Sequence, residues 1–226
     1  MIQKTRGIVI HYIKYQETSI IVKIFTEEFG MVSFLVNGIR SSKSKRSIGY
    51  FQPFSLLDLV TYIKNGREIQ RLSEYKYLHA TPSISHDIRK ATIALFLSEV
   101  LGKALQQEHG AQHELFQYLF DMTTVLDASS SGIENFHLQF LIRLTYHLGI
   151  GIADGESLLE SMEVESSDES TLNFISRLVN SELNDKVPSS GNERMKALEL
   201  IIQYFNHHGT SLGEIKSMKV LHQVFN

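Results

Sequence analysis

The chain has 226 residues, of which 42% are hydrophobic and 21% charged, a composition typical of a globular protein with one or two domains. It contains no cysteine, which excludes disulfides, thiolate metal sites and a cysteine nucleophile and is typical of a reducing compartment. No apolar run approaches the ~20 residues that a transmembrane helix needs, and residues 1–10 lack the unbroken apolar core of a signal peptide. We therefore expect a soluble cytoplasmic protein.

The charge is divided unevenly along the chain. Residues 1–80 contain 12 Lys and Arg against 6 Asp and Glu, whereas residues 81–226 contain 10 against 19. The net charge of −3 therefore combines a basic N-terminal part with an acidic remainder. Such asymmetry indicates that the basic part binds a polyanion.

Residues 7–78 carry the pattern of a small all-β domain. Five short runs rich in β-branched and aromatic residues are separated by turn signals, among them Asn65-Gly66, which favours a two-residue hairpin. The runs cover residues 7–13, 19–25, 31–36, 54–63 and 67–78. Five strands with one long loop near residues 38–49 are typical of a closed or half-closed barrel such as the OB-fold. A two-sheet sandwich remains the alternative, because a count of strands does not separate the two.

After Thr81-Pro82 the apolar spacing becomes helical. Six apolar residues between Ile93 and Ala104 repeat at i, i+3, i+4, i+7, i+8 and i+11, which places them on one face of a helix. The same kind of spacing predicts further helices near residues 115–126, 136–148, 195–205 and 215–225. We therefore predict an α+β protein in which a five-stranded OB-fold β-barrel over residues 1–80 precedes an α-helical domain over residues 81–226. The boundary is expected near residues 79–84.

One segment of the helical part breaks this pattern. Residues 144–176 contain no lysine or arginine, and the glycines at its start are followed by a run of acids. These acids are Asp154, Glu156, Glu160, Glu163, Glu165, Asp168 and Glu169. Their spacing fits no EF-hand loop. We interpret residues 149–175 as an irregular, mobile and solvated acidic insertion, with a metal site built from its carboxylates as the alternative.

Recognisable catalytic motifs are absent. The sequence has no phosphate-binding loop, no dinucleotide-binding glycine motif and no nucleophile elbow. His86-Asp87 resembles the dyad of metal-dependent phosphohydrolases, and His109 and His113 have a spacing that would suit zinc on a helix. Gly110 between them favours the start of a helix over its interior. We predict a protein that is not an enzyme and binds no metal or cofactor, with a phosphohydrolase that uses His86 and Asp87 as an alternative.

The strongest chemical signal is the polar run at residues 37–47. Four cations, Arg40, Lys43, Lys45 and Arg46, alternate there with serines on the long loop after the third strand. Cations neutralise phosphates and hydroxyl groups donate to phosphate oxygens, so the loop is predicted to bind nucleic acid. Further cations expected on a basic face of the barrel are Arg6, Lys14, Lys23, Arg67 and Arg71. Candidates for stacking on bases are Tyr12, Phe25, Phe34 and Tyr50, although strand spacing also favours core positions for most of them.

Several short motifs follow one another in a specific order along the whole chain. They are Thr5–Ile10, Tyr15–Ser19, Phe25-Thr26 with Gly30, Asn37–Arg40 with Lys43-Ser44, Phe51–Phe54, Phe140-Leu141 and Ile215–Leu221. In this order and spacing, the chain resembles the RecO family of bacterial recombination mediators in DNA repair.

The resemblance implies an OB-fold that binds single- and double-stranded DNA, joined to a helical domain. Proteins of this family anneal complementary strands and, with RecR, help to load the RecA recombinase on DNA coated by single-stranded-DNA-binding protein. The implied partners are DNA, RecR and the acidic C-terminal tail of the single-stranded-DNA-binding protein, which would dock on the helical domain. The implied location is the bacterial cytoplasm and nucleoid, without membrane association.

The chain departs from the family in one respect. Many members carry a four-cysteine zinc module in the helical region, whereas this chain has no cysteine, so we expect no zinc. Judged by its residues alone, the barrel has an alternative role as an OB-fold module that binds oligosaccharide or protein. That alternative predicts binding that is insensitive to salt.

Overall fold

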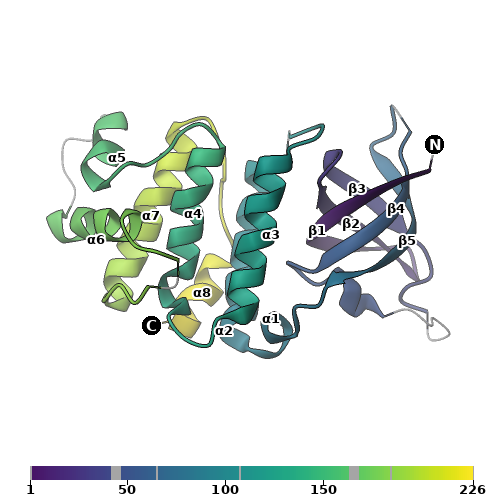
Figure 1. The fold of residues 1–226 in the computed structure, drawn as a ribbon, viewed down its shortest axis with the longest axis horizontal. Coiled ribbons are helices and arrows are strands. Elements are labelled where there is room, and N and C mark those ends of the chain that lie inside the picture. Colours follow the sequence, from purple (N-terminus) through teal and green to yellow (C-terminus); the bar gives the residue numbers. More distant parts are fainter. Residues whose placement is uncertain are drawn as a thin grey trace. The chain divides into compact units, whose positions relative to one another are not determined.

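The computed structural model describes residues 2–41, 47–64, 66–106, 108–162, 168–183 and 185–225. The chain divides into two compact units, Met1–Asp127 and Ala128–Asn226. The first holds a β-barrel and the helices that follow it, and the described residues of the second form helices and loops (Figure 1). The change from strand to helix falls between His79 and Pro82, but the first unit extends beyond it.

Five strands close into a barrel in the first unit. They are β1 (Ile2–Tyr15), β2 (Ser19–Thr26), β3 (Gly30–Val36), β4 (Leu56–Tyr62) and β5 (Ile69–His79). The order around the barrel is β1-β2-β3-β5-β4, and β4 returns to pair with β1. Neighbouring strands are antiparallel except β3 and β5, which are parallel. This closed barrel confirms the predicted OB-fold and excludes the two-sheet sandwich. A short 3-10 helix, η1 (Ile48–Phe51), precedes β4.

The barrel interior is filled by inward-facing apolar side chains. Its core consists of Val9, Ile20, Val22, Ile24, Phe34, Val36, Ile39, Phe51, Leu57, Leu59 and Leu72. Two candidates for base stacking, Phe25 and Phe34, are completely buried, so both take the core positions that strand spacing favoured for most of these aromatic residues. Phe34 belongs to this core, and the ring of Phe25 stacks on that of Phe116 with centroids 6.4 Å apart. Strand spacing identifies apolar positions, but it does not tell which face of a strand points inward.

Three helices complete the first unit. They are α1 (Pro82–His86), α2 (Ile88–Ala104) and α3 (His113–Ala128). The ammonium group of Lys90, a residue of α2 that is only 4% exposed, donates to the Ser83 hydroxyl at 2.6 Å and to the Asp127 carbonyl at 2.7 Å. A buried ammonium group needs such acceptors. Lys90 therefore ties the three helices together.

The turn between β2 and β3 is joined to the segment before α3 by backbone hydrogen bonds. The Met31 N–H donates to the Glu108 carbonyl at 3.0 Å, and the Gly110 N–H donates to the Phe29 carbonyl at 3.3 Å. Gly30 has φ +65°, and a Cβ there would lie 2.5 Å from the Glu108 carbonyl oxygen. Only glycine permits this approach. The barrel and α3 are thus connected within one unit.

The second unit is built from helices. They are η2 (Ile133–Asn135), α4 (Phe136–His147), α5 (Gly155–Ser161), α6 (Glu169–Val179), α7 (Gly191–His207) and α8 (Met218–Phe225). Helices α4, α6 and α7 pack against one another. Their largest completely buried side chains are Phe136, Phe140, Phe174 and Phe205. Among the described helices, none combines the length and apolar character needed to cross a membrane.

Where we predicted an irregular insertion over residues 149–175, the structure has the regular helix α5 and the first part of the regular helix α6. The Asp154 carboxylate accepts from the Ser157 N–H at 2.8 Å and begins α5, and Asp168 begins α6. Hydrogen bonds from Ser157 lower the pKa of Asp154, and the Lys196 ammonium, at 2.7 Å, is the main cause of the lowered pKa of Asp168. A carboxylate at a helix N-terminus is stabilised by the free backbone N–H groups and by the helix dipole. Part of the acidic run therefore caps helices. Glu156, Glu160 and Glu169 lie within the two helices, and Glu163 and Glu165 lie outside the described part of the chain.

Candidate nucleic-acid interface

Arg71 lies at the centre of an outward-facing row of residues that crosses the barrel. It is opposite Tyr62 of β4 in the antiparallel ladder and opposite Leu35 of β3 in the parallel one. The row continues through Ile21 of β2 to Ile13 of β1. Residues directly opposite one another project from the same side of a sheet. Tyr62 is 37% exposed and Ile13 54% exposed, so the row offers a cation, an aromatic ring and apolar surface to solvent.

Lys23 adds a second cation to this outer face. It lies opposite His11 of β1 and Ser33 of β3, and Ser33 is opposite Ile69 of β5. Burial, with a smaller contribution from the Lys23 charge, lowers the pKa of His11. The imidazole is therefore neutral near pH 7, and Lys23 carries the charge of this row.

Two grooves flank Arg71. We call the first the β2–β3 groove; its volume is about 370 Å³, and it is lined by Tyr15, Ile21, Leu35, Asn37, Arg67, Ile69, Gln70 and Arg71. We call the second the β4–β5 groove; its volume is about 460 Å³, and it is lined by Tyr62, Lys64, Arg67, Gln70, Arg71, Leu72 and Ser73. None of these described lining residues is acidic. Both grooves combine positive charge with a tyrosine, which is what a single-stranded nucleic acid requires.

The turn between β4 and β5 is held in place by Gln70. Its amide nitrogen donates to the carbonyl oxygens of Lys64 and Arg67 at 3.0 and 2.8 Å, and its Oε1 accepts from the Lys64 N–H at 2.9 Å. Gln70 is 8% exposed and lies opposite the buried Phe34, so it projects toward the barrel interior beneath the turn. Lys64 and Arg67 are exposed. Gln70 therefore fixes the backbone from which two cations project.

Arg40 is anchored to the turn between β1 and β2. Its N–H donates to the Thr18 carbonyl at 2.9 Å, and its guanidinium Nη1 donates to the Gln16 carbonyl at 3.2 Å. Next to this turn, the Ser19 hydroxyl donates to Oδ1 of Asn37 at 3.2 Å, and Asn37 lines the β2–β3 groove. Arg40 therefore lies at the same end of the barrel as this groove. Three further cations of the predicted loop lie outside the described residues: Lys43, Lys45 and Arg46.

Other predicted site residues do not join the row of Arg71. Lys14 is opposite Ile20, whose side chain is buried. The register therefore places Lys14 on the same side of the sheet as Ile20, which is the inner side, near the exposed end of β1. Tyr12 is half-buried against the barrel core. The ring of Tyr50 stacks on that of Tyr77 with centroids 4.3 Å apart.

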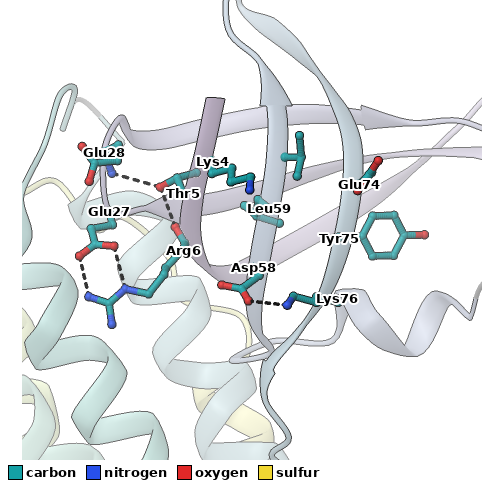
Figure 2. Close-up of a pocket in the computed structure, with 11 residues that line it drawn as sticks. Lys4, Thr5, Arg6, Glu27, Glu28, Asp58, Leu59, Glu74, Tyr75 and Lys76 are labelled. Atoms are coloured by element: carbon teal, nitrogen blue, oxygen red, sulfur yellow. Dashed lines mark hydrogen bonds and ion pairs between the residues drawn. The ribbon is translucent and has the colours of Figure 1, made fainter. Parts of the chain in front are cut away.

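Arg6, predicted on the same basic face, is engaged in a bidentate ion pair with Glu27 (Figure 2). Its Nε and Nη2 donate to the two carboxylate oxygens at 2.7 and 2.6 Å. These hydrogen bonds lower the pKa of Glu27 and raise that of Arg6. The guanidinium carbon also lies 5.1 Å from the ring centroid of Phe116 and 5.7 Å from that of Phe120, both on α3. Arg6 therefore fastens β1 to α3.

Arg6 and Glu27 line a third groove, which Figure 2 shows; it lies on the outer face of β1, β4 and β5. Its volume is about 690 Å³, and it is lined by Lys4, Thr5, Arg6, Glu27, Glu28, Asp58, Leu59, Val60, Glu74, Tyr75 and Lys76. Four of these residues are acidic. Two of the three cations are paired within the groove, since Lys76 lies 3.3 Å from Asp58. This groove is therefore unsuited to a polyanion, unlike the two that flank Arg71.

The histidines considered as metal ligands have other surroundings. Nδ1 of His86 lies 2.6 Å from the Pro82 carbonyl, and Asp87 caps α2. His109 forms a β-bridge with Gly30, and α3 begins only at His113, so the two histidines do not share a helix face. No described carboxylate or histidine completes a metal-sized cluster with His86 and Asp87.

One described cluster, Glu27, Glu28 and His113, has ligand atoms close enough to surround a metal ion. Both oxygens of Glu27 already accept from Arg6. A cation bound there would have to displace that guanidinium group. The donor set therefore fits the ion pair better than it fits a metal.

Comparisons with known proteins identify the family of the chain. Residues 1–81 match the model for the N-terminal part of recombination protein O, and residues 85–153 match the model for its C-terminal part. The chain is 32% identical over 237 residues to the DNA repair protein RecO of Flavobacterium psychrophilum, with 99% of each chain covered. It is 31% identical to that of Azobacteroides pseudotrichonymphae and 32% identical to that of Bacteroides fragilis, with all of each chain covered.

The chain belongs to the RecO family of DNA repair proteins. This finding confirms the resemblance of the ordered motifs, and the barrel and helices are those that the RecO family implied. Within the RecO fold, four residues that sequence reasoning missed lie around the two grooves: Tyr15, Tyr62, Lys64 and Gln70. For Lys64, the sequence contains one indication, its place next to the Asn65-Gly66 turn signal. For the other three, the strand register was needed.

Proposed function

We propose that this RecO family protein is a DNA-binding recombination mediator. It binds single- and double-stranded DNA, anneals complementary strands and, together with RecR, helps to load RecA on DNA coated by single-stranded-DNA-binding protein. It acts in the bacterial cytoplasm at the nucleoid. Family membership supports the role in DNA repair. The observation that carries the DNA-binding site is that Arg67 and Arg71 line two grooves, each with a tyrosine and with no acid among its described lining residues.

The position of these cations supports the proposal. OB-folds bind oligonucleotides on the face of strands 2 and 3 and with the loops between strands 1 and 2 and between strands 4 and 5. Here Lys23 lies on β2, Arg71 of β5 lies opposite Leu35 of β3, Arg40 is bound to the first loop and Arg67 projects from the second. Among the described residues, no ion pair involves any of these four. Their charges are available to phosphates, whose binding releases counterions.

Annealing follows from the same site without covalent chemistry. Two strands repel each other until their phosphates are neutralised, and their bases must remain exposed to pair. Neither requirement involves nucleotide hydrolysis, and the sequence has no phosphate-binding loop. We therefore expect the purified protein to speed annealing of complementary oligonucleotides without ATP and without a divalent metal. An absolute requirement for either would contradict this part of the proposal.

The DNA-binding site is tested by fluorescence anisotropy of a labelled oligo(dT) at several salt concentrations, with and without chelator. We expect affinity to fall with salt and the chelator to have no effect. The double variant Arg67→Ala/Arg71→Ala should lower the log–log salt slope by about 1.4, because each lost contact to a single strand accounts for about 0.7. The matched control is Lys4→Ala/Lys76→Ala, whose cations line the acidic third groove. Salt-insensitive binding would favour the module for oligosaccharide or protein instead.

The mediator role is tested with the partners. Coated single-stranded DNA is incubated with RecA, with RecR and with this protein, and RecA filament formation is followed by its ATP hydrolysis. We expect loading only when both RecR and this protein are present. A peptide with the acidic C-terminal tail of the single-stranded-DNA-binding protein should compete, because the tail is proposed to dock on the helical part. Undiminished loading in the absence of this protein would contradict the mediator role.

A further inference from the structure

We propose that the β4–β5 groove is a second base-binding subsite for the same single strand, with Tyr62 as its stacking residue. This inference rests on the proposed DNA binding and extends it. In it, one strand crosses the ridge formed by Arg67 and Arg71, with bases seated in the β2–β3 groove on one side and in the β4–β5 groove on the other.

The first argument is the place of Tyr62 relative to Arg71. The two residues are directly opposite in the antiparallel β4–β5 ladder, a relationship that brings Cβ atoms within about 5 Å of each other. Leu35 occupies the corresponding place on the other side of Arg71. The guanidinium therefore lies between a tyrosine of one groove and the apolar floor of the other. A phosphate bound by Arg71 would have one base directed to each groove.

The second argument is a local irregularity of β5 that shapes the β4–β5 groove. Val60 pairs with Glu74 and Thr61 with Leu72, so Ser73 has no partner on β4. Such a bulge bends a strand and redirects its side chains, and bulges are common beside binding sites. Ser73 lines the groove. Its hydroxyl can donate to a phosphate or a base.

The third argument is charge. Lys64, Arg67 and Arg71 line the β4–β5 groove, and no described carboxylate does so. The third groove is larger, about 690 Å³ against 460 Å³, but four carboxylates line it. A strand that leaves the ridge is therefore attracted by the β4–β5 groove and repelled by the third. The volume of the β4–β5 groove also lies within the range of small-ligand sites, which suits a nucleoside.

The two grooves belong to one path because they share residues. Arg67, Gln70 and Arg71 line both. The Gln70 amide is occupied by the backbone of Lys64 and Arg67, so the ridge between the grooves is fixed. Tyr15, 40% exposed, lines the first groove, and Tyr62 lines the second. One strand contacting both tyrosines would use two stacking interactions around shared phosphate contacts.

The test measures oligo(dT) affinity and photo-crosslinking with the full chain. Stacking of one base on an aromatic ring accounts for a change of roughly 5- to 140-fold in affinity. We expect Tyr62→Ala to weaken binding of a twelve-nucleotide oligo(dT) by a factor in this range and Tyr62→Phe to restore it. Tyr77→Ala is the matched control, because Tyr77 is an exposed tyrosine of β5 that lines neither groove. An oligonucleotide with scattered 5-iododeoxyuridine should crosslink to both Tyr15 and Tyr62.

The outcomes separate this inference from the proposed function. If Tyr15→Ala weakens binding and Tyr62→Ala does not, with crosslinks confined to Tyr15, DNA occupies the β2–β3 groove alone and the inference is overturned. If Tyr62→Phe binds as weakly as Tyr62→Ala, the ring does not act by stacking and the inference also fails. If the parent protein binds no oligo(dT), the proposed function itself fails. Circular dichroism of each variant checks that it folds.

Discussion

The side-chain amide of Gln70 donates to the carbonyl oxygen of Arg67 at 2.8 Å, so a buried residue of β5 fixes the backbone of an exposed arginine. The same amide group makes two further hydrogen bonds to the backbone of Lys64. Cations on a flexible turn would lose conformational entropy when they bind a phosphate. At the proposed DNA-binding site Gln70 reduces that loss, because it holds the backbone of Lys64 and Arg67 in place.

We therefore predict that Gln70→Leu weakens both the fold and DNA binding. Loss of these hydrogen bonds should lower the free energy of unfolding by about 1–3 kcal/mol. Gln70→Glu should also be destabilising, because its carboxylate would face the carbonyl oxygens of Lys64 and Arg67. Urea unfolding and oligo(dT) anisotropy measure the two effects. Gln203→Leu, an exposed glutamine of α7, is the control. If the Gln70→Leu protein remains folded and binds oligo(dT) as tightly as the parent, the hydrogen bonds of Gln70 do not contribute to DNA binding.

A second prediction concerns the pair of Arg6 and Glu27. A double-mutant cycle with Arg6→Ala and Glu27→Ala should give a coupling free energy of about 1–2 kcal/mol, because the pair is bidentate and half-buried. The hydrogen bonds from Arg6 lower the pKa of Glu27 from its ordinary 4.5. The unfolded chain therefore takes up a proton first, and this stabilisation is present above pH 4.5 and lost as pH falls through the lower, folded pKa.

Arg6→Ala should consequently change unfolding more than it changes DNA affinity. Urea midpoints at pH 7 and pH 4 measure the first, and anisotropy with oligo(dT) measures the second. A loss of DNA affinity as large as that of Arg71→Ala, with an unchanged urea midpoint, would return Arg6 to the DNA-binding residues.

Arg6 and Arg71 also show how far sequence reasoning reached. Apolar periodicity correctly predicted the five strands and most of the longer helices, because burial imposes a period of about 2 on strands and 3.6 on helices. The cations of the barrel were also visible in the sequence. Their partners were not, because the pairing of Arg6 with Glu27 and of Arg71 with Tyr62 depends on strand register and closure. The acidic composition of residues 149–175 also led us to miss α5 and α6. Two of those acids, Asp154 and Asp168, cap the N-termini of these helices.

A third prediction concerns His137, which is buried in the second unit. Burial, and to a smaller extent Arg194 and His222, lower its pKa from 6.5 to about 3. The unfolded chain therefore binds a proton below pH 6.5 that the folded chain does not. Stability from this group should fall by about 1.4 kcal/mol for each pH unit below 6.5. We expect His137→Met to remove this part of the slope between pH 7.5 and pH 5, measured by urea unfolding.

His207→Met is the control for this prediction, because His207 is an exposed histidine at the end of α7. It should retain the parental slope. An identical slope in the His137→Met protein would mean that His137 is protonated in the folded state and that its surroundings do not exclude the charge.

A fourth prediction concerns the smallest piece that binds DNA. The basic excess of residues 1–80 predicts that the barrel carries DNA binding. In the first unit, however, Phe25 and Arg6 both pack on the ring of Phe116. A chain that ends at residue 80 lacks Phe116 and therefore exposes Phe25 and Arg6. We expect residues 1–127 to be more stable than residues 1–80 in urea and to bind oligo(dT) more tightly. Residues 81–226 should bind it poorly. Tight binding by this last piece would reverse the assignment.

The last prediction separates the loop at residues 37–47 from the face that carries Arg71. Arg40 is fixed beside the β2–β3 groove through Gln16 and Thr18, and the other three cations of the loop follow it in the chain. If all four contact phosphates, replacing Arg40, Lys43, Lys45 and Arg46 with alanine should lower the salt slope by roughly 2–3, at about 0.7 per contact. The loss should be nearly uniform across base sequences, because phosphate contacts position a strand but do not read it.

Comparison with the face makes the prediction specific. The Arg67→Ala/Arg71→Ala protein should lose about half as much slope, because it removes two contacts instead of four. Substitutions of exposed loop residues usually change stability by no more than about 0.5 kcal/mol, so the loop variant should melt like the parent. A loop variant that melts normally and keeps the parental salt slope would assign the phosphate contacts to Lys23, Lys64, Arg67 and Arg71 alone.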